Sequence, residues 1–250
     1  MDLSTILKDR YHLIKSIGEG AFARVYECFD MVESEQYAVK IINKGYLLKS
    51  QEKVYDLFRN EVALMKKLSN NPNVVKLHDF FETENLSFVV MEYCDGGDLE
   101  SYETKNRPLS EAVVIDMMLQ LLNAFRAMHE LNAMHRDVKL ANILINKGVL
   151  KLADFGMCKE LDNALQNTDT QVGTPLTMAP EIFEGVKYGL KVDIFSLGVI
   201  FYNLLYHGEF PFDAKNIKQL FIAIKLQKID FNLKGIKISQ HLQELIQKML

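Results

Sequence analysis

The sequence predicts an α+β protein in which a strand-rich N-terminal part precedes a mostly helical C-terminal part. Residues 11–42 contain runs rich in Val, Ile and Tyr with turn-forming residues between them, which is typical of strands. Residues 191–207 are apolar on nearly every side, as expected of a buried helix. The pattern changes to helical after Gly96-Gly97, which indicates a hinge between two lobes near residues 93–98.

The remaining elements follow from the spacing of apolar residues. A helix is expected over residues 50–68, because its apolar residues form one stripe. Two further strands are expected near 74–81 and 86–92, and a helix over about 111–130 after the capping residue Ser110. A small hairpin is expected around Lys147-Gly148, and an amphipathic helix over 241–250.

Composition excludes several classes of protein. The 250 residues carry a net charge of −4, so no global basic field favours nucleic acid or a membrane surface. Three cysteines, Cys28, Cys94 and Cys158, fit no zinc spacing and indicate a reducing compartment. With no signal-peptide core and no apolar run of about 18 residues, the cytoplasm is the default location.

The first candidate site is the glycine-rich stretch Gly18-Glu19-Gly20-Ala21-Phe22-Ala23, in which backbone amides could approach phosphates closely. An ordinary hairpin turn is an open alternative, and a dinucleotide-binding loop is another. That loop opens a helix and has an acidic residue about 20 positions later. Here a strand-like run follows, and the residue 20 positions after Gly20 is Lys40. A hairpin lid over ATP therefore fits better.

Lys40 ends the apolar run Tyr37-Ala38-Val39-Lys40, and Glu61 falls on the apolar stripe of the 50–68 helix. A carboxylate that points into a core is unfavourable unless it is paired. Lys40 is a fitting partner, and the pair would hold the lysine against the α and β phosphates. An exposed Glu61 is the alternative.

The most specific segment is His135-Arg136-Asp137-Val138-Lys139-Leu140-Ala141-Asn142. Asp137 could accept the proton of a substrate hydroxyl, Lys139 could offset charge on a phosphoryl group, and Asn142 could supply a neutral oxygen to Mg²⁺. Asp154-Phe155-Gly156 follows, with its Asp 17 residues after Asp137, and Asp154 offers a charged oxygen to Mg²⁺.

With Ala179-Pro180-Glu181, these motifs stand in the order found in eukaryotic protein kinases, which the chain resembles over essentially its whole length. The resemblance implies a bilobal fold with a small antiparallel sheet lobe that carries one main helix, and a larger helical lobe. It implies lobes at residues 1–92 and 99–250, a hinge at 93–98, and a domain that is incomplete at its C-terminus. ATP and Mg²⁺ are the implied cofactors.

The resemblance also assigns nucleotide contacts and a spine. Val25, Ala38 and Leu144 would enclose the adenine, and Met91 would be the gatekeeper. The backbone of Glu92 and Cys94 would form hydrogen bonds with the adenine. Asp98 would lie near the ribose. Gly18, Gly20 and Lys40 would contact phosphates. The spine that joins the lobes would be a stack of Met65, Leu77, His135 and Phe155. Asp193 would support the backbone of the catalytic loop.

Substrate type and regulation are suggested in the same way. Lys139, two residues after Asp137, is similar to Ser/Thr kinases, and Thr174 would bridge Asp137 and Lys139 near the substrate hydroxyl. Thr170 stands where similar kinases carry an activating phosphate, added by an upstream kinase or by autophosphorylation, which could pair with Arg136. A hydroxyl in a mobile loop without this role is the alternative.

Two other functions remain open. A kinase-like scaffold that binds nucleotide without turnover is the second candidate, although Lys40, Asp137 and Asp154 are all present. A nicotinamide-dependent oxidoreductase is a distant third. The subfamily is undecided, because residues 154–159 resemble lipid-regulated kinases, whereas 172–181 and 192–204 resemble autophagy-initiating or calcium/calmodulin-type kinases.

Overall fold

The computed structural model describes residues 5–20, 23–45, 52–160, 173–212 and 214–250. The chain divides into two compact units, Met1–Asp95 and Gly96–Leu250. The division falls within the stretch 93–98. No helix in the described part of the chain combines the length and the hydropathy needed to cross a bilayer.

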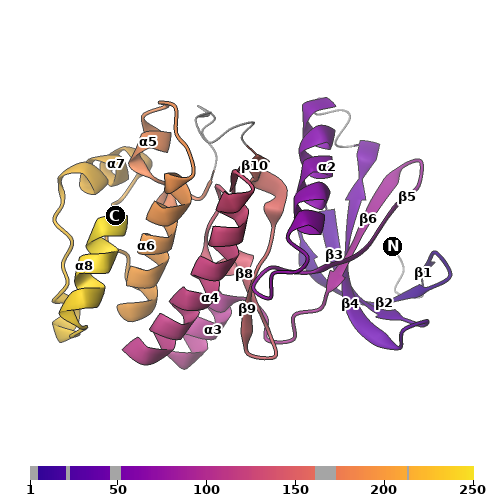
Figure 1. The fold of residues 1–250 in the computed structure, drawn as a ribbon, viewed down its shortest axis with the longest axis horizontal. Helices are drawn as coiled ribbons and strands as arrows, with labels where there is room; N and C mark the ends of the chain where they lie inside the picture. The colour runs from indigo at the N-terminus through magenta and orange to yellow at the C-terminus, as the bar shows by residue number, and fades with distance from the viewer. Residues whose placement is uncertain (1–4, 21–22, 46–51, 161–172, 213) are drawn as a thin grey trace. The chain divides into compact units, whose positions relative to one another are not determined.

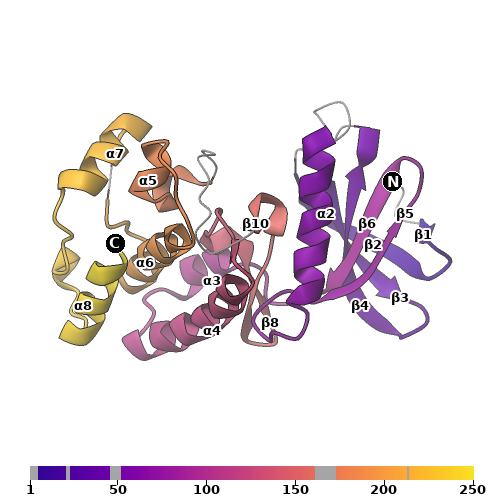
Figure 2. The same ribbon diagram turned by 45° about the horizontal axis from the view of Figure 1, so that its top comes forward.

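The first unit is an antiparallel sheet with one long helix. The strands are β1 (Ile6–Leu7), β2 (Tyr11–Glu19), β3 (Ala23–Asp30), β4 (Glu35–Asn43), β5 (Leu77–Glu82) and β6 (Leu86–Glu92), in the order β1-β2-β3-β4-β6-β5. Helix α2 (Glu52–Lys67) runs along one face of this sheet (Figures 1 and 2). The stripe expected for this helix is buried at Phe58, Val62 and Met65, and Leu68 just beyond the helix is also buried.

The strand expected at 74–81 begins later than the sequence indicates, because β5 starts at Leu77. Val74 and Val75 are buried, but a turn around Asn71–Asn73 occupies the chain just before them. An apolar pair therefore enters the core here without joining the sheet ladder.

The second unit is mainly helical. Its longer helices are α3 (Leu99–Asn106), α4 (Glu111–Glu130), α6 (Lys191–Leu205), α7 (Ile217–Leu226) and α8 (Gln240–Met249), with the short α5 (Pro180–Phe183) before α6. Two small sheets pair β7 (Ala133–Met134) with β10 (Lys159–Glu160), and β8 (Ile143–Asn146) with β9 (Val149–Leu152). Helices α4 and α6 lie side by side in both views (Figures 1 and 2).

Local chemistry explains the start of α4 and the β8–β9 hairpin. Ser110 caps α4, because its hydroxyl accepts a hydrogen bond from the backbone N–H of Val113 at 3.4 Å. Lys147 and Gly148 join β8 to β9 with φ values of 50° and 80°, the pair of positive angles that a tight hairpin turn requires. The hairpin follows directly after the loop that carries Asp137 and Asn142, and so fixes the end of that loop.

Helix α6 is the centre of the second unit. Thirteen of its fifteen residues are buried, which agrees with a sequence that is apolar on nearly every side. Asp193 is among the buried residues and is fully enclosed. A carboxylate held inside an apolar helix must be satisfied by hydrogen bonds, and its partners lie in the candidate site.

Candidate active site

Lys40 and Glu61 form an ion pair inside the first unit. Lys40 lies on β4 and Glu61 on α2, and Lys40 Nζ donates to Glu61 Oε1 at 2.8 Å. Glu61 is only 6% exposed. The exposed alternative for Glu61 is therefore wrong, and this side chain fills a core position of the helix because it has a cationic partner.

The glycine-rich segment connects β2 to β3, which run antiparallel, and Gly18 lies opposite Val25 in their ladder. Gly20 N donates to Ala23 O at 2.8 Å and tightens the end of the hairpin. Because the segment joins two strands and opens no helix, it does not match a dinucleotide-binding loop. Ala21 and Phe22 lie outside the described residues.

The residues expected around the adenine divide between the units. In the first unit, Ala38 on β4 is buried and faces Met91 on β6 in the ladder, and Val25 on β3 is half-buried. Glu92 ends β6 and its Oε1 accepts from Lys76 N at 2.6 Å, while Cys94 is half-buried just beyond it.

Asp98 and Leu144 belong to the second unit and form an isolated β-bridge with each other. The Asp98 carboxylate caps α3, because Oδ1 accepts from Ser101 N at 2.7 Å and Oδ2 accepts from Ser101 Oγ at 3.0 Å. A structural role for Asp98 therefore stands beside the ribose contact that the resemblance implies.

Three side chains converge on the carboxylate of Asp137. Lys139 Nζ lies 2.8 Å from Oδ2, and Asn142 Nδ2 donates to the same oxygen at 3.0 Å. Thr174 Oγ1 donates to Oδ1 at 2.7 Å. Thr174 was expected to bridge Asp137 and Lys139. In the structure, Asp137 is the central residue, and Thr174 and Lys139 each contact its carboxylate.

This environment keeps Asp137 ionised. Partial burial by itself would raise the pKa of the carboxyl, but hydrogen bonds from Lys139 and Thr174 and the positive charge of Lys139 outweigh burial and lower the pKa below its ordinary value. At neutral pH, Asp137 is therefore a hydrogen-bond acceptor with a fixed orientation.

Buried Asp193 supports the backbone on which Asp137 sits. Its Oδ2 accepts from His135 N at 2.9 Å and its Oδ1 accepts from Arg136 N at 3.0 Å. The expected support of the loop by Asp193 is confirmed by these two bonds. His129 Nε2 lies 3.3 Å from Oδ2, a contact with α4 that the sequence motifs do not indicate.

Arg136 is held in a strained conformation beside a glycine. Its φ is 67°, in the left-handed region, and it is 8% exposed. Gly173 has a φ of 122°, and a Cβ atom there would lie 2.5 Å from Arg136 O. Only glycine fits at position 173, because any side chain there would clash with the backbone of Arg136. Thr170, the expected phosphorylation site, lies outside the described residues and stays a prediction.

Asp154 and Phe155 follow β9 and differ sharply in exposure. Asp154 has φ 58° and ψ 75°, and it is exposed, whereas Phe155 is 1% exposed. The ring of Phe155 packs on His135 at 5.6 Å between centroids, and His135 Nε2 lies 3.0 Å from Ala153 O. His135 and Phe155 thus form the part of the expected spine in the second unit, and Met65 and Leu77 lie in the first.

Asn142 and Asp154 offer hard oxygen atoms that suit Mg²⁺. The Asn142 amide donates from Nδ2 to both the backbone O and the carboxylate of Asp137, at 2.9 and 3.0 Å. This orientation commits the nitrogen end of the amide to Asp137, so Oδ1 is the end that could bind a cation. The donor set therefore fits a hard divalent ion.

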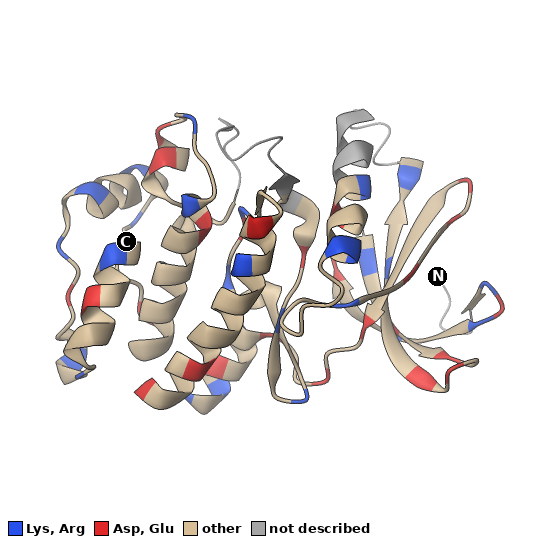
Figure 3. Ribbon diagram, viewed as in Figure 1, with Lys and Arg blue, Asp and Glu red and all other residues tan. Residues whose placement is uncertain are grey.

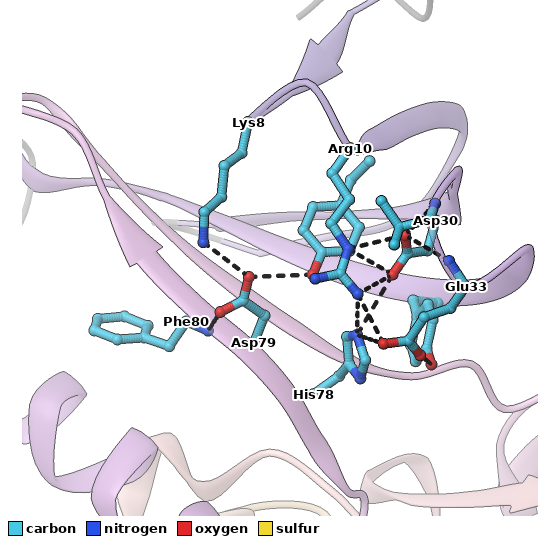
Figure 4. Close-up of polar contacts among 10 residues, drawn as sticks. Lys8, Arg10, Asp30, Glu33, His78, Asp79 and Phe80 are labelled. Atoms are coloured by element: carbon cyan, nitrogen blue, oxygen red, sulfur yellow. Dashed lines mark hydrogen bonds and ion pairs between the residues drawn. The ribbon is translucent and has the colours of Figure 1, made fainter.

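A second polar cluster, which the sequence analysis missed, lies in the first unit. Arg10 stands between Asp30, Glu33 and His78 (Figure 4), with Nη2 2.6 Å from Asp30 Oδ2, 2.8 Å from Glu33 Oε1 and 3.3 Å from His78 Nε2. Candidate ligand atoms of the two acids and His78 lie within 4.8 Å of one another, a metal-like spacing. Because the Arg10 guanidinium already binds both carboxylates and occupies the space between them, we assign the group as an ion-pair cluster.

Polar contacts next to this cluster join strands that are far apart in the sheet order. Strands β2 and β5 are separated by three strands in the sheet order, yet Tyr11 Oη of β2 donates to Asp79 Oδ2 of β5 at 3.1 Å. Figure 4 shows Lys8 reaching the same Asp79 carboxylate, at 3.2 Å. The sheet therefore curls until its two ends meet through polar side chains.

Comparisons with known proteins agree with this arrangement. The protein kinase domain family matches residues 11–250. The chain is 36% identical over 222 residues to the serine/threonine-protein kinase Nek5 of Homo sapiens, covering 86% of this chain and 30% of the relative. It is 33% identical over 247 residues to the serine/threonine-protein kinase atg1 of Dictyostelium discoideum, covering 96% and 36%.

A third relative is the serine/threonine-protein kinase DCLK3 of Mus musculus, 37% identical over 236 residues, covering 92% of this chain and 29% of the relative. The chain spans about a third of the length of these curated relatives. The matched residues include the whole of both compact units from residue 11 onward. The chain therefore belongs to the protein kinase domain family, and is a domain of the eukaryotic serine/threonine type.

Proposed function

We propose that this domain transfers the γ-phosphoryl group of ATP to a Ser or Thr hydroxyl of a protein substrate. The observation that carries the proposal is the carboxylate of Asp137, held on one side by Thr174 and on the other by Lys139 and Asn142. An ionised acceptor with a fixed direction is what a hydroxyl nucleophile needs.

The reaction is an in-line displacement at phosphorus. The substrate hydroxyl oxygen forms a bond to the γ-phosphorus, and the bond from that phosphorus to the β,γ-bridging oxygen breaks, so ADP leaves with the bonding electrons. Asp137 orients the hydroxyl and accepts its proton. Lys139, 2.8 Å from Asp137, offsets negative charge on the group in transfer.

The other proposed roles follow the same chemistry. Lys40, fixed by Glu61, would bind the α and β phosphates, and the backbone around Gly18 and Gly20 would cover them. Asn142 and Asp154 would hold Mg²⁺, which when bound supplies positive charge that offsets the charge of the phosphates. Val25, Ala38 and Leu144 would enclose the adenine, with Met91 as the gatekeeper. The backbone of Glu92 and Cys94 would form hydrogen bonds with the adenine, and Asp98 would lie near the ribose.

The cell compartment and partners are proposals of the same kind. The three cysteines, all within the described residues, are thiols and not disulfides, which suits a reducing compartment such as the cytoplasm. A protein substrate and an upstream kinase, or autophosphorylation at Thr170, complete the proposed set of partners.

Acceptor specificity tests the proposal. Wild-type chain is incubated with γ-labelled ATP, Mg²⁺ and one peptide made in versions that differ only in the acceptor: Ser, Thr, Tyr or Ala. We expect label on the Ser and Thr versions alone, and no transfer when Mg²⁺ is chelated. Label on the Tyr version, or nucleotide binding without transfer to any version, would contradict the proposed activity.

A further inference from the structure

Helix α7 exposes two large apolar side chains on one side. Ile222 is 55% exposed and Leu226 is 79% exposed, while Leu220 of the same helix is buried at 4%. Residues four apart lie one above the other on a helix, so Ile222 and Leu226 form a continuous apolar ridge. Such a ridge in contact with water is the kind of surface that marks an interaction site.

Lysines surround this ridge. Residues 214–228 contain Lys215, Lys218, Lys225 and Lys228 and no Asp or Glu, although the whole chain has a net charge of −4. Lys218 and Lys225 belong to α7, and Lys215 and Lys228 lie just before and after it; Figure 3 marks basic positions in blue along this part of the chain. Lys225 is paired with Glu184, so Lys215, Lys218 and Lys228 supply the local positive charge, and this charge favours an acidic partner.

The ridge is attached to the segment that follows Thr174. Helix α5 starts one residue after Ala179, and Phe183 of α5 packs on Phe221 of α7 at 5.8 Å between ring centroids. Lys225 also forms an ion pair with Glu184, next to the end of α5. A polypeptide that reaches Asp137 along residues 174–181 could therefore continue onto α7.

We propose that α7 is a docking surface for protein substrates that carry, apart from their target hydroxyl, a short segment of acidic and apolar side chains. The inference rests on the proposed function, and it names the class of substrate that the domain prefers. Two apolar anchors of the segment would cover Ile222 and Leu226, and its carboxylates would face Lys218 and Lys228.

A protein segment suits this surface better than a lipid bilayer does. Interfacial helices bury a broad apolar face in the membrane, whereas the broad face of α7 is already packed on its own unit through Leu220 and Phe221. What remains is a narrow ridge flanked by charge, which matches a few side chains of a partner.

Binding is measured first, by fluorescence anisotropy of a labelled peptide in which two leucines four residues apart are flanked by aspartates. Ile222→Ser with Leu226→Ser, and separately Lys218→Glu with Lys228→Glu, should each weaken binding at least about tenfold. Added salt should weaken binding to the wild type. A peptide with lysines in place of the aspartates should not bind.

Matched changes elsewhere in the same unit serve as controls. Leu119 on α4 is 63% exposed and Lys105 on α3 is also exposed, so Leu119→Ser with Lys105→Glu alters similar surface at another place. This control should bind like the wild type, and all variants should melt alike. Equal binding by all variants, association with phosphatidylserine vesicles without peptide binding, or self-association through α7 would each overturn the proposal.

A transfer assay separates this inference from the proposed function. With a short acceptor peptide, the α7 variants and the wild type should react equally. With an acceptor joined to the acidic-apolar segment, the α7 variants should show a KM raised about tenfold at unchanged kcat. Failure of the wild type to phosphorylate either substrate would refute the proposed function, whereas equal KM values for the joined substrate would refute the docking surface alone.

Discussion

Thr174 Oγ1 donates a hydrogen bond of 2.7 Å to Asp137 Oδ1, and so joins two residues that are 37 positions apart in the chain. The bond connects the loop after β7 to the segment before α5. It fixes one oxygen of the carboxylate, while Lys139 and Asn142 fix the other. The orientation of Asp137 thus depends on residues from two separate segments.

Removal of this bond should change the pH dependence of transfer. The bond helps to lower the pKa of Asp137, so Thr174→Val should raise that pKa. The acidic limb of kcat/KM should then move to higher pH, and kcat should fall by about tenfold or more. Thr174→Ser keeps a hydroxyl and should resemble the wild type. An unchanged acidic limb in Thr174→Val would contradict this role.

Variants of the Lys40–Glu61 pair should separate its effect on stability from its effect on catalysis. Lys40→Met leaves Glu61, only 6% exposed, without its cation, and should lower the free energy of unfolding by about 3–5 kcal/mol while abolishing transfer. Lys40→Met with Glu61→Leu should recover most of the stability, because no buried charge remains. Denaturant unfolding measures the stability of both variants, and the rate of ADP formation measures transfer. Transfer by the double variant would show that Lys40 has no role in catalysis.

Gly173 offers a test of backbone crowding. Gly173→Ala would place a Cβ atom 2.5 Å from Arg136 O, next to Asp137, and should lower kcat at least about tenfold as the loop shifts. Gly148 also has a positive φ, of 80°, but nothing lies within 4 Å of its added Cβ. Gly148→Ala should therefore cost about 1–2 kcal/mol of stability with little change in kcat. Equal kcat for both variants would contradict the crowding argument.

The Arg10 cluster should make the first unit sensitive to acid. The hydrogen bond from Arg10 lowers the pKa of Asp30 from 3.8 to about 2, against the opposing effect of burial. A depressed pKa means that Asp30 stabilises the fold above pH 4, and that this contribution is lost as the pH falls toward 2.

Asp30→Asn should remove a contribution on the order of 1–2 kcal/mol at neutral pH and flatten the decline below pH 4. Unfolding by urea at several pH values, followed by circular dichroism, measures both effects. Asp116→Asn, on the exposed side of α4, is the matched control. A decline of equal steepness in Asp30→Asn and wild type would show that other carboxyls cause the loss.

Much of the fold could be predicted, because local chemistry and burial agree there. Lys147 and Gly148 have the positive φ values of a tight turn, as their residue types indicate. Glu61 on an apolar stripe indicated a cationic partner, and Lys40 on β4 is that partner. Strand β4 ends at Asn43, one residue beyond the expected strand-rich range 11–42, and the glycine-rich stretch joins β2 to β3 as a hairpin.

Other features depend on contacts that spacing along the chain does not encode. Arg10, Asp30 and His78 meet only because the sheet curls, and the sequence distance from Arg10 to His78 is 68 residues. His129 reaches Asp193 across 64 residues, from α4 to α6. The exposure of Ile222 and Leu226 could not be predicted from the sequence either, since an apolar residue in a helix is ordinarily assigned to the core.

The most direct test compares labelled phosphate transfer by wild type and by Asp137→Asn, with ATP, Mg²⁺ and a generic Ser/Thr peptide. Asn keeps the size of the side chain but cannot accept the proton of the hydroxyl, so transfer should fall at least about a hundredfold while nucleotide binding and melting stay unchanged. That result would assign the central role in phosphoryl transfer to Asp137. Equal transfer by both proteins, or none from a folded wild type that binds ATP, would contradict it.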